Sequence, residues 1–235
     1  MSIYGQPQAF EHRLNGRITY QRLFKESQTM FKPPTLPKGT TLKCTMISLR
    51  SIPNLTVIRP ADANETAQAW RVAIEHTDGP VVLVFTRQGL PIIDQSKFGK
   101  ATELEKGAYI LSDSLIDPQV ILIATGSEVD LIVQAQAKLS EEGISSRVVS
   151  MPSWELFEKQ DAAYKEKIFP ASIKKRLAVE AGSPLGWHKY VTDEGAIIAM
   201  HGYGESAPAE ELYKVFGFTV ENVVKQAKAL LEIAI

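Results

Sequence analysis

An arginine that follows a buried strand is the residue of this sequence best suited to binding a charged ligand. Residues 81–86 are apolar without alternation, which predicts a strand covered on both faces, and Arg87 comes directly after them. Ligands bind at the carboxyl ends of strands in open parallel sheets, and a guanidinium can hold a phosphate through two hydrogen bonds. The position therefore suits a sugar phosphate. On the residues alone, a salt bridge from Arg87 to Asp62 or Asp94 is the favoured alternative.

Two other residues, Ser127 and His188, lie in segments that can form a ligand or interface surface. Ser127 lies in the turn at residues 125–128 between a strand and a helix, where free N–H groups favour anions, although a tight connection explains this turn more simply. Ser127 and Asp130 also have the spacing of a capping box. A single histidine with no other ligand at metal-binding spacing makes a poor metal site, so His188 is interpreted as a hydrogen-bonded residue at a packed interface. No catalytic residue, cofactor-binding residue or metal ligand is assigned.

Strands alternate with helices along the chain, a pattern typical of a doubly wound α/β fold. Residues 55–58 and 81–86 are expected strands, and the helix between them is capped by Asp62. The inward face of that helix is predicted to carry Ala63, Ala67, Trp70 and Ile74. Residues 90–106 suit a linker. Further strands are expected at residues 106–111, 119–124, 147–151, 176–180 and 196–200, and helices after residue 127 and at residues 154–167, 208–216 and 219–231.

The composition of the 235 residues, 44% hydrophobic and 23% charged with a net charge of -1, is that of an ordinary soluble protein. This balance gives no indication of a nucleic-acid partner. No apolar run approaches the ~20 residues of a membrane span, so no membrane partner is expected. A single cysteine, Cys44, excludes an intramolecular disulfide framework and indicates a cytoplasmic location.

Several long segments in the same order resemble transketolase. RPADANETAQAW, followed by a strand that ends in TRQGLP, is similar to the last third of its pyrimidine-binding domain. ATGSEVDL, AVEAGSPLGWHKY and GYGESAPAEELYKVFGFTVENVV are similar to its carboxy-terminal domain. The resemblance runs almost continuously from about residue 48 to residue 231. It implies a mostly parallel, doubly wound carboxy-terminal domain at residues 107–235, preceded by a partial pyrimidine-binding unit at residues 47–95.

The resemblance also implies an activity, the transfer of a two-carbon ketol unit between sugar phosphates in the pentose phosphate pathway. The complete enzyme uses thiamine diphosphate and magnesium, and we expect this chain alone to bind neither. Arg87 is similar to the family arginine that contacts the terminal phosphate of the substrate, with Thr86 in place of the usual serine. This resemblance reverses the preference for a salt bridge. A homodimer and a partner subunit with the amino-terminal domains are expected.

Residues 1–46 do not match this family and carry seven of the 26 Lys and Arg residues but only two of the 27 Asp and Glu residues. Their prolines and the lack of any lasting period predict an irregular head. The acidic residue that activates the cofactor and the histidine loop of the family are not found there, and His12 receives no catalytic role. Two alternatives therefore stay open, namely a truncated or frameshifted gene product and a non-catalytic domain for dimerisation or regulation by a small ligand.

Overall fold

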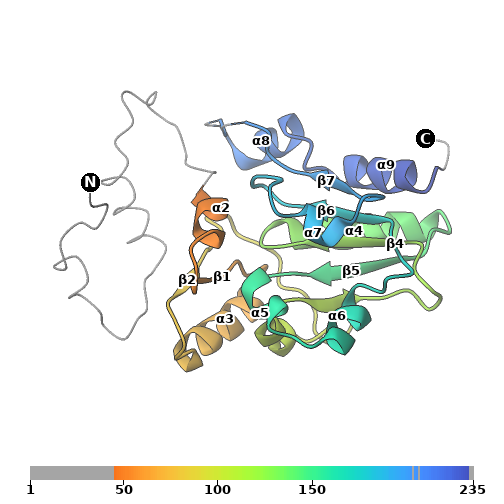
Figure 1. Cartoon of the computed structure of the whole chain (residues 1–235). Coiled ribbons are helices and arrows are strands. Elements are labelled where there is room, and N and C mark those ends of the chain that lie inside the picture. The colour runs from red at the N-terminus through yellow and green to blue at the C-terminus, as the bar shows by residue number, and fades with distance from the viewer. Residues whose placement is uncertain (1–44, 203, 206, 233–235) are drawn as a thin grey trace, which may run out of the picture.

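The computed structural model describes residues 45–202, 204, 205 and 207–232 (Figure 1). The predicted irregular head, residues 1–46, lies outside the described residues except for its last two. Those two residues begin a short helix, α2 (Thr45–Arg50).

A five-stranded sheet forms the centre of the larger unit, with the strand order β3-β5-β4-β6-β7. Its strands are β3 (Tyr109–Ser112), β4 (Val120–Ala124), β5 (Ser146–Ser150), β6 (Arg176–Val179) and β7 (Ala196–Ile198). Only β3, at one edge, pairs antiparallel with its neighbour; the other three pairings are parallel. All five residues of the central strand β4 are buried, as expected for a strand with helices on both faces.

Helices cover both faces of this sheet, so the doubly wound, mostly parallel prediction is confirmed (Figure 1). Alternate residues of β4 point to opposite faces, Leu122 to one core and Ile123 to the other. The helices against the Leu122 face are α4 (Glu128–Glu141), α8 (Ala209–Val215) and α9 (Val220–Leu230). The helices against the Ile123 face are α5 (Trp154–Glu158), α6 (Ala162–Ile168) and α7 (His188–Val191).

The smaller unit is a two-stranded parallel sheet of β1 (Thr56–Ile58) and β2 (Val81–Leu83). Helix α3 (Ala63–Glu75) packs on one face of this sheet and α2 on the other. Asp62 caps α3 by accepting a hydrogen bond from Glu65 N–H, as predicted.

The predicted inward face of α3 is wrong. Trp70 is 45% exposed and Ile74 is 57% exposed, and Ala63 and Ala67 are exposed as well. The side chains that α3 buries are Glu65, Ala69, Val72 and Ala73. Small side chains let this helix approach the sheet closely, and the Glu65 carboxylate finds donors there, so the face with the larger apolar residues turns outward. Trp70 instead stacks on Phe85, with 6.1 Å between ring centroids.

Two other details differ from the prediction. Strand β2 ends at Leu83, although Val84 N–H still donates to Ile58 O, so Arg87 follows the strand after a short interval rather than directly. The segment at residues 90–106 is more than a linker, because it contains the 3-10 helix η2 (Ala101–Lys106). Leu104 of this helix is fully buried together with Leu156 of α5 against the smaller unit. The two units therefore share an apolar contact.

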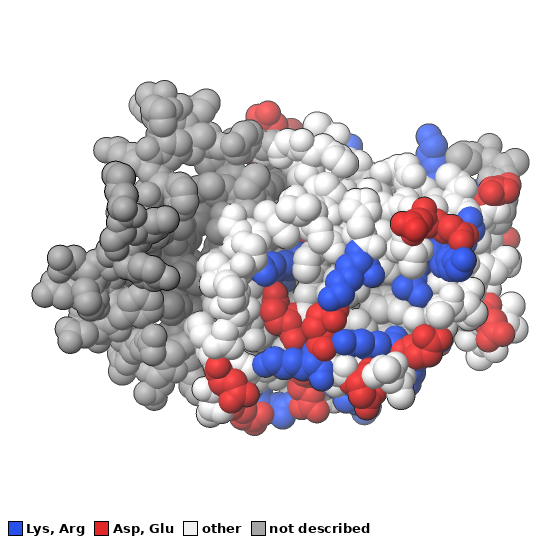
Figure 2. Space-filling model, viewed as in Figure 1, with Lys and Arg blue, Asp and Glu red and all other residues white. Residues whose placement is uncertain are grey.

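None of the helices in the described part of the chain is both long and apolar enough to cross a membrane. On the face seen in Figure 2, acidic and basic side chains intermingle rather than separate by sign. Lys165 and Lys189 both form ion pairs with Glu158, and such partly exposed pairs are typical of a solvated surface.

Candidate functional site

Arg87 lies on the exposed side of the smaller unit, in the loop that follows β2. Among the described residues, no ion pair or hydrogen bond involves its side chain. A guanidinium in this condition keeps its five N–H donors available for a ligand.

The two carboxylates proposed as alternative partners of Arg87 have other partners. Asp62 accepts hydrogen bonds from the N–H groups of Glu65 and Ile93, at 2.8 and 2.9 Å. Asp94 accepts from the N–H and hydroxyl groups of Ser96, which lowers the pKa of this carboxyl. Each carboxylate thus has hydrogen-bond donors other than Arg87.

A hollow of about 340 Å³ lies at the carboxyl ends of β1 and β2, next to Arg87 in sequence. Asp62, Thr66, Thr86 and Gln88 contribute polar groups to its lining, and the Phe85 ring contributes an apolar wall. A small polyhydroxylated molecule has donors and acceptors that match such a lining. The hollow and the exposed guanidinium together form the candidate site.

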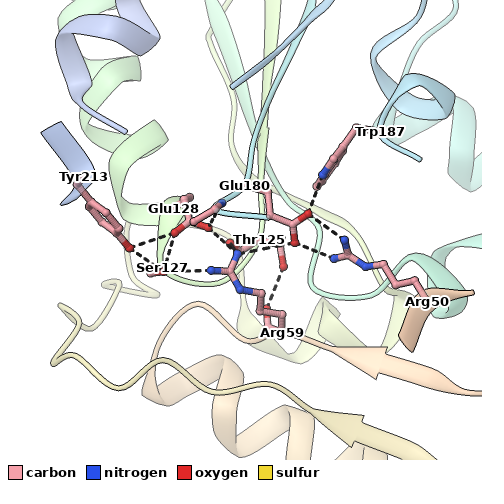
Figure 3. A network of polar contacts seen from close by, with 9 residues as sticks. Arg50, Arg59, Thr125, Ser127, Glu128, Glu180, Trp187 and Tyr213 are labelled. Atoms are coloured by element: carbon pink, nitrogen blue, oxygen red, sulfur yellow. Dashed lines mark hydrogen bonds and ion pairs between the residues drawn. The ribbon is translucent and has the colours of Figure 1, made fainter. Parts of the chain in front are cut away.

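The second predicted location, the turn with Ser127, is covered by an arginine of the smaller unit. Arg59 comes directly after β1, and its guanidinium donates to Thr125 O at 2.6 Å and to Ser127 Oγ at 3.2 Å (Figure 3). The same guanidinium forms an ion pair with Glu128. Gly126 has a φ of 62°, and a β-carbon there would come within 2.5 Å of Arg59 Nε. The group bound at this turn is therefore the Arg59 guanidinium of the same chain.

Ser127 does not form the predicted capping box with Asp130. Its backbone is already helical, with a φ of -58°, and its hydroxyl donates to Glu128 Oε1 at 2.7 Å. The hydroxyl of Tyr213, from α8, lies 3.0 Å from Ser127 Oγ. The structure thus places Ser127 at the contact between the two units, where it is 9% exposed.

A second arginine extends this network to the neighbouring strand end. Arg50 donates to both oxygens of Glu180 at 2.9 Å, and Trp187 Nε1 donates to Glu180 Oε2 at 2.7 Å. Glu180 directly follows β6, and one of its oxygens lies 3.8 Å from Arg59 Nη1. We call Arg50, Arg59, Glu128 and Glu180 the interunit ion network (Figure 3).

The interunit ion network is almost completely buried, with side-chain exposures from 0% for Glu128 to 11% for Arg59. Burial opposes the charge of Glu180, but Arg50 and Arg59 outweigh it, so the pKa of this carboxyl is lowered. Burial likewise opposes the charge of Arg59, while Glu128 and Glu180 raise its pKa above the usual value. Burial and the nearby Glu128 raise the pKa of Tyr213 to about 12. The shifts of Arg59 and Glu180 both favour the charged form, as expected for partners in a buried ion pair.

Outside the interunit ion network, the buried carboxyl of Glu65 also links the two units, through hydrogen bonds rather than an ion pair. Its carboxyl accepts hydrogen bonds from Tyr109 of β3 at 2.8 Å, from Ser150 of β5 and from Ala61 N–H at 2.7 Å. Burial raises the pKa of Glu65, although these donors oppose the shift. Its position inside the contact makes it structural.

His188, by contrast, is exposed at the start of α7, and none of the hydrogen bonds found between the described residues involves it. The packing of this segment depends on its neighbour Trp187, which is fully buried. The Trp187 ring meets Trp154 edge-on at 5.0 Å between centroids.

Two family models match most of the described chain. The transketolase pyrimidine binding domain matches residues 44–92, and the transketolase-like C-terminal domain matches residues 107–219. The chain belongs to the transketolase family. The first of these matches implies thiamine diphosphate as the cofactor of the family.

Individual transketolases agree with this assignment. The transketolase of Bacillus subtilis (strain 168) is 51% identical over 187 residues, which cover 79% of this chain and 28% of the relative. The structure of the Pichia stipitis transketolase in complex with sedoheptulose-7-phosphate matches with a TM-score of 0.73 and 37% identity, over 80% of this chain and 27% of that one. A split gene transketolase in the form of an inactive beta4 tetramer, 23% identical, shares the fold with a TM-score of 0.64 over 79% of this chain and 60% of its own.

The chain spans about 28% of the length of the curated transketolases that it matches. Along the chain, the match to the pyrimidine binding domain is followed by the match to the C-terminal domain, so the described residues include the junction between the two. The interunit ion network lies at that junction.

The sequence analysis missed Arg50, Arg59 and Glu180. A signal was nevertheless present, because Arg59 and Glu180 each follow a buried parallel strand directly, the same feature that drew attention to Arg87. Their ion-pair partners lie more than 60 positions away along the chain, so the pattern identifies the residues but does not indicate their partners.

Proposed function

We propose that this chain takes part in the transfer of a two-carbon ketol unit between sugar phosphates, and that Arg87 binds the phosphate of the substrate. The observation that carries the proposal is the exposed Arg87 after β2, without an ion pair among the described residues. Its two neighbours in sequence, Thr86 and Gln88, line a hollow together with Asp62 and Thr66. Family membership supports it. The related enzyme from Pichia stipitis binds sedoheptulose-7-phosphate, a ligand of the same class.

This chain supplies binding and orientation rather than bond making. Two parallel N–H···O bonds from Arg87 would fix the phosphate end of an open-chain ketose, and the polar lining of the hollow would hold its hydroxyl groups. Thr86 offers a hydroxyl next to Arg87, as the serine of the family does. These residues set which substrates bind and how they lie.

In this proposal the cofactor site of the complete enzyme lies outside the described residues. Between residues 45 and 232, as far as they are described, no three His, Cys, Asp or Glu side chains are arranged to hold a metal ion. The buried carboxyl of Glu65 is surrounded by hydrogen-bond donors that leave no opening for a ligand. We assign neither thiamine diphosphate nor magnesium to the described residues.

A partner that carries the remaining transketolase domains would complete the enzyme. The proposal draws support from the existence of a transketolase made from a split gene. We expect the complete assembly to be a dimer of such pairs in the cytoplasm, in keeping with the single cysteine.

The test is a titration of the purified chain with xylulose 5-phosphate and with xylulose, followed by NMR. The wild-type chain should bind the phosphorylated sugar more tightly. Arg87→Ala should weaken the phosphorylated sugar about ten- to a hundredfold, because charge-assisted hydrogen bonds contribute ~1.5 to 3 kcal/mol, and leave xylulose unchanged. Arg87→Lys should recover only part of the affinity, because an ammonium cannot form the paired contact.

Equal losses on both sugars would remove Arg87 from the site. A chain that forms dimers and binds neither sugar would instead support the alternative of a non-catalytic domain. With the amino-terminal transketolase domains added, the same three variants should show the same ranking in kcat/KM for ketol transfer.

A further inference from the structure

The loop that carries Arg87 is anchored at both ends, because its backbone groups form hydrogen bonds to the rest of the smaller unit. At its start, Val84 N–H donates to Ile58 O at 2.9 Å. At its end, Ile93 N–H donates to Asp62 Oδ2 at 2.9 Å, and Ile93 O accepts from Asn64 Nδ2 at 3.0 Å. Both polar backbone groups of Ile93 are thus held by side chains at the start of α3.

The groups that hold Ile93 are themselves fixed. Asp62 is 6% exposed, and its second oxygen caps α3 through Glu65 N–H at 2.8 Å. Asn64 lies on the first turn of the same helix, with its Nδ2 also 3.4 Å from Asp62 Oδ2. Helix α3 packs on β1, β2 and η2, so the anchor has the rigidity of the core.

The loop between the anchors has less support of its own. Phe85 stacks on Trp70, but Arg87, Gln88 and Gly89 are exposed. The side chain of an arginine on such a loop keeps its orientation only if the loop backbone is fixed. If the loop became ordered only when the ligand binds, the lost conformational entropy would lower the affinity.

We propose that Asp62 and Asn64 are positioning residues, which hold the Arg87 loop through Ile93 in the geometry that binds a substrate phosphate. This inference rests on the proposed function of Arg87. Neither side chain needs to touch the phosphate, because both act through the backbone of Ile93.

The two functions of Asp62 can be separated by substitution. Serine is a good helix cap, so Asp62→Ser keeps the hydrogen bond to Glu65 N–H but is too short to hold Ile93 as well. Asn64→Ala removes the hydrogen bond to Ile93 O from the other side. The matched control is Asp161→Ser, because Asp161 caps α6 through Tyr164 N–H at 2.7 Å and lies far from the loop in sequence.

The first measurement is amide hydrogen exchange in the full chain. Asp62→Ser should speed exchange at Ile93 about tenfold or more, because the bond to a carboxylate is lost, whereas Asp161→Ser should leave it unchanged. The second measurement is the affinity for xylulose 5-phosphate. Asp62→Ser and Asn64→Ala should each weaken it about two- to tenfold. Asn64 does not line the hollow, so Asn64→Ala should leave the affinity for xylulose unchanged. Asp62 does line it, so Asp62→Ser should weaken xylulose as well, but less than xylulose 5-phosphate.

A double-mutant cycle decides whether these residues act through Arg87. In an Arg87→Ala background, Asn64→Ala should cause no further loss of affinity for xylulose 5-phosphate, because the group that it positions has gone. An equal loss in both backgrounds, or an unchanged affinity in Asp62→Ser and Asn64→Ala, would overturn the positioning role while leaving Arg87 in the site. A wild-type chain that binds the phosphorylated sugar no better than Arg87→Ala would overturn both proposals.

Discussion

Two arginines follow neighbouring strands of the same two-stranded sheet, and their surroundings are opposite. Arg59 comes after β1, has a side chain that is 11% exposed, and pairs with carboxylates from α4 and the end of β6. Arg87 comes after β2, is exposed, and forms no ion pair among the described residues. The difference comes from what faces each strand end, because the larger unit covers the end of β1 and leaves that of β2 open. One arginine therefore joins the units, and the other is available to a ligand.

The largest expected effect is the loss of the buried arginine. Arg59→Ala should lower the free energy of unfolding by about 3 to 5 kcal/mol or prevent folding, because it leaves Glu128 buried without a cation. Urea denaturation measures this effect. The control is Arg71→Ala, which removes exposed ion pairs to Glu75 and Glu105 and should cost about 1 kcal/mol or less. Equal losses in both variants would show that the interunit ion network adds little stability.

A smaller effect is expected from filling the space that Arg59 occupies. Gly126→Ala should destabilise the chain by about 1 to 3 kcal/mol more than Gly143→Ala, as overpacking does. Both glycines have positive φ values, but a β-carbon at Gly143 meets nothing within 4 Å, whereas one at Gly126 meets the guanidinium. In an Arg59→Ala background the excess should vanish. Its persistence would mean that the turn itself, and not Arg59, rejects the larger side chain.

The buried carboxyl of Glu65 should make stability depend on pH in a defined direction. Because its pKa is raised in the folded chain, the folded state binds more protons, and its contribution to stability falls as the pH rises above the ordinary value of 4.5. One such group changes the free energy of unfolding by at most about 1.4 kcal/mol for each pH unit. Relative to Glu65→Gln, the wild-type chain should thus lose stability between pH 4.5 and neutral pH. A stability difference that does not change with pH would contradict the raised pKa.

The smallest effect on stability is expected at the exposed arginine. Arg87→Ala should change the free energy of unfolding by about 0.5 kcal/mol or less, since no buried group among the described residues loses a partner. Thermal unfolding of Arg87→Ala beside Arg59→Ala tests this contrast directly. A loss at Arg87 comparable to that at Arg59 would mean that Arg87 is a structural residue.

Much of the fold was predictable because strands and helices carry local patterns. The apolar run that contains β4, the broken helix that forms α5 and α6, and the stripe on α9 all appear close to their predicted places. The inward face of α3 was not predictable in this way. Helix α3 has two stripes of residues with helical spacing, and either could face inward. The choice depended on Tyr109 and Ser150, which lie on strands elsewhere in the chain and donate hydrogen bonds to Glu65.

The candidate site was likewise predictable only in part from the sequence. Arg87 could be marked as a ligand-binding residue from its place after a strand, and Asp62 as a helix cap from its place before a helix. The hydrogen bond from Ile93 N–H to Asp62 could not be predicted, because it joins a backbone group to a side chain 31 positions away and leaves no periodic pattern in the sequence.

The amino-acid sequence by itself determined the α/β class, the order of the strands and helices along the chain, and the resemblance to transketolase, since each depends on residues near one another in sequence. Only the tertiary structure decided which arginine is buried and which is exposed. Arg59 and Arg87 have similar local surroundings in the sequence, and their roles differ because the carboxyl edge of the five-stranded sheet, with Thr125, Glu128 and Glu180, lies against one of them. An ion pair formed across such a distance depends on how two sheets pack, and no local pattern records that packing.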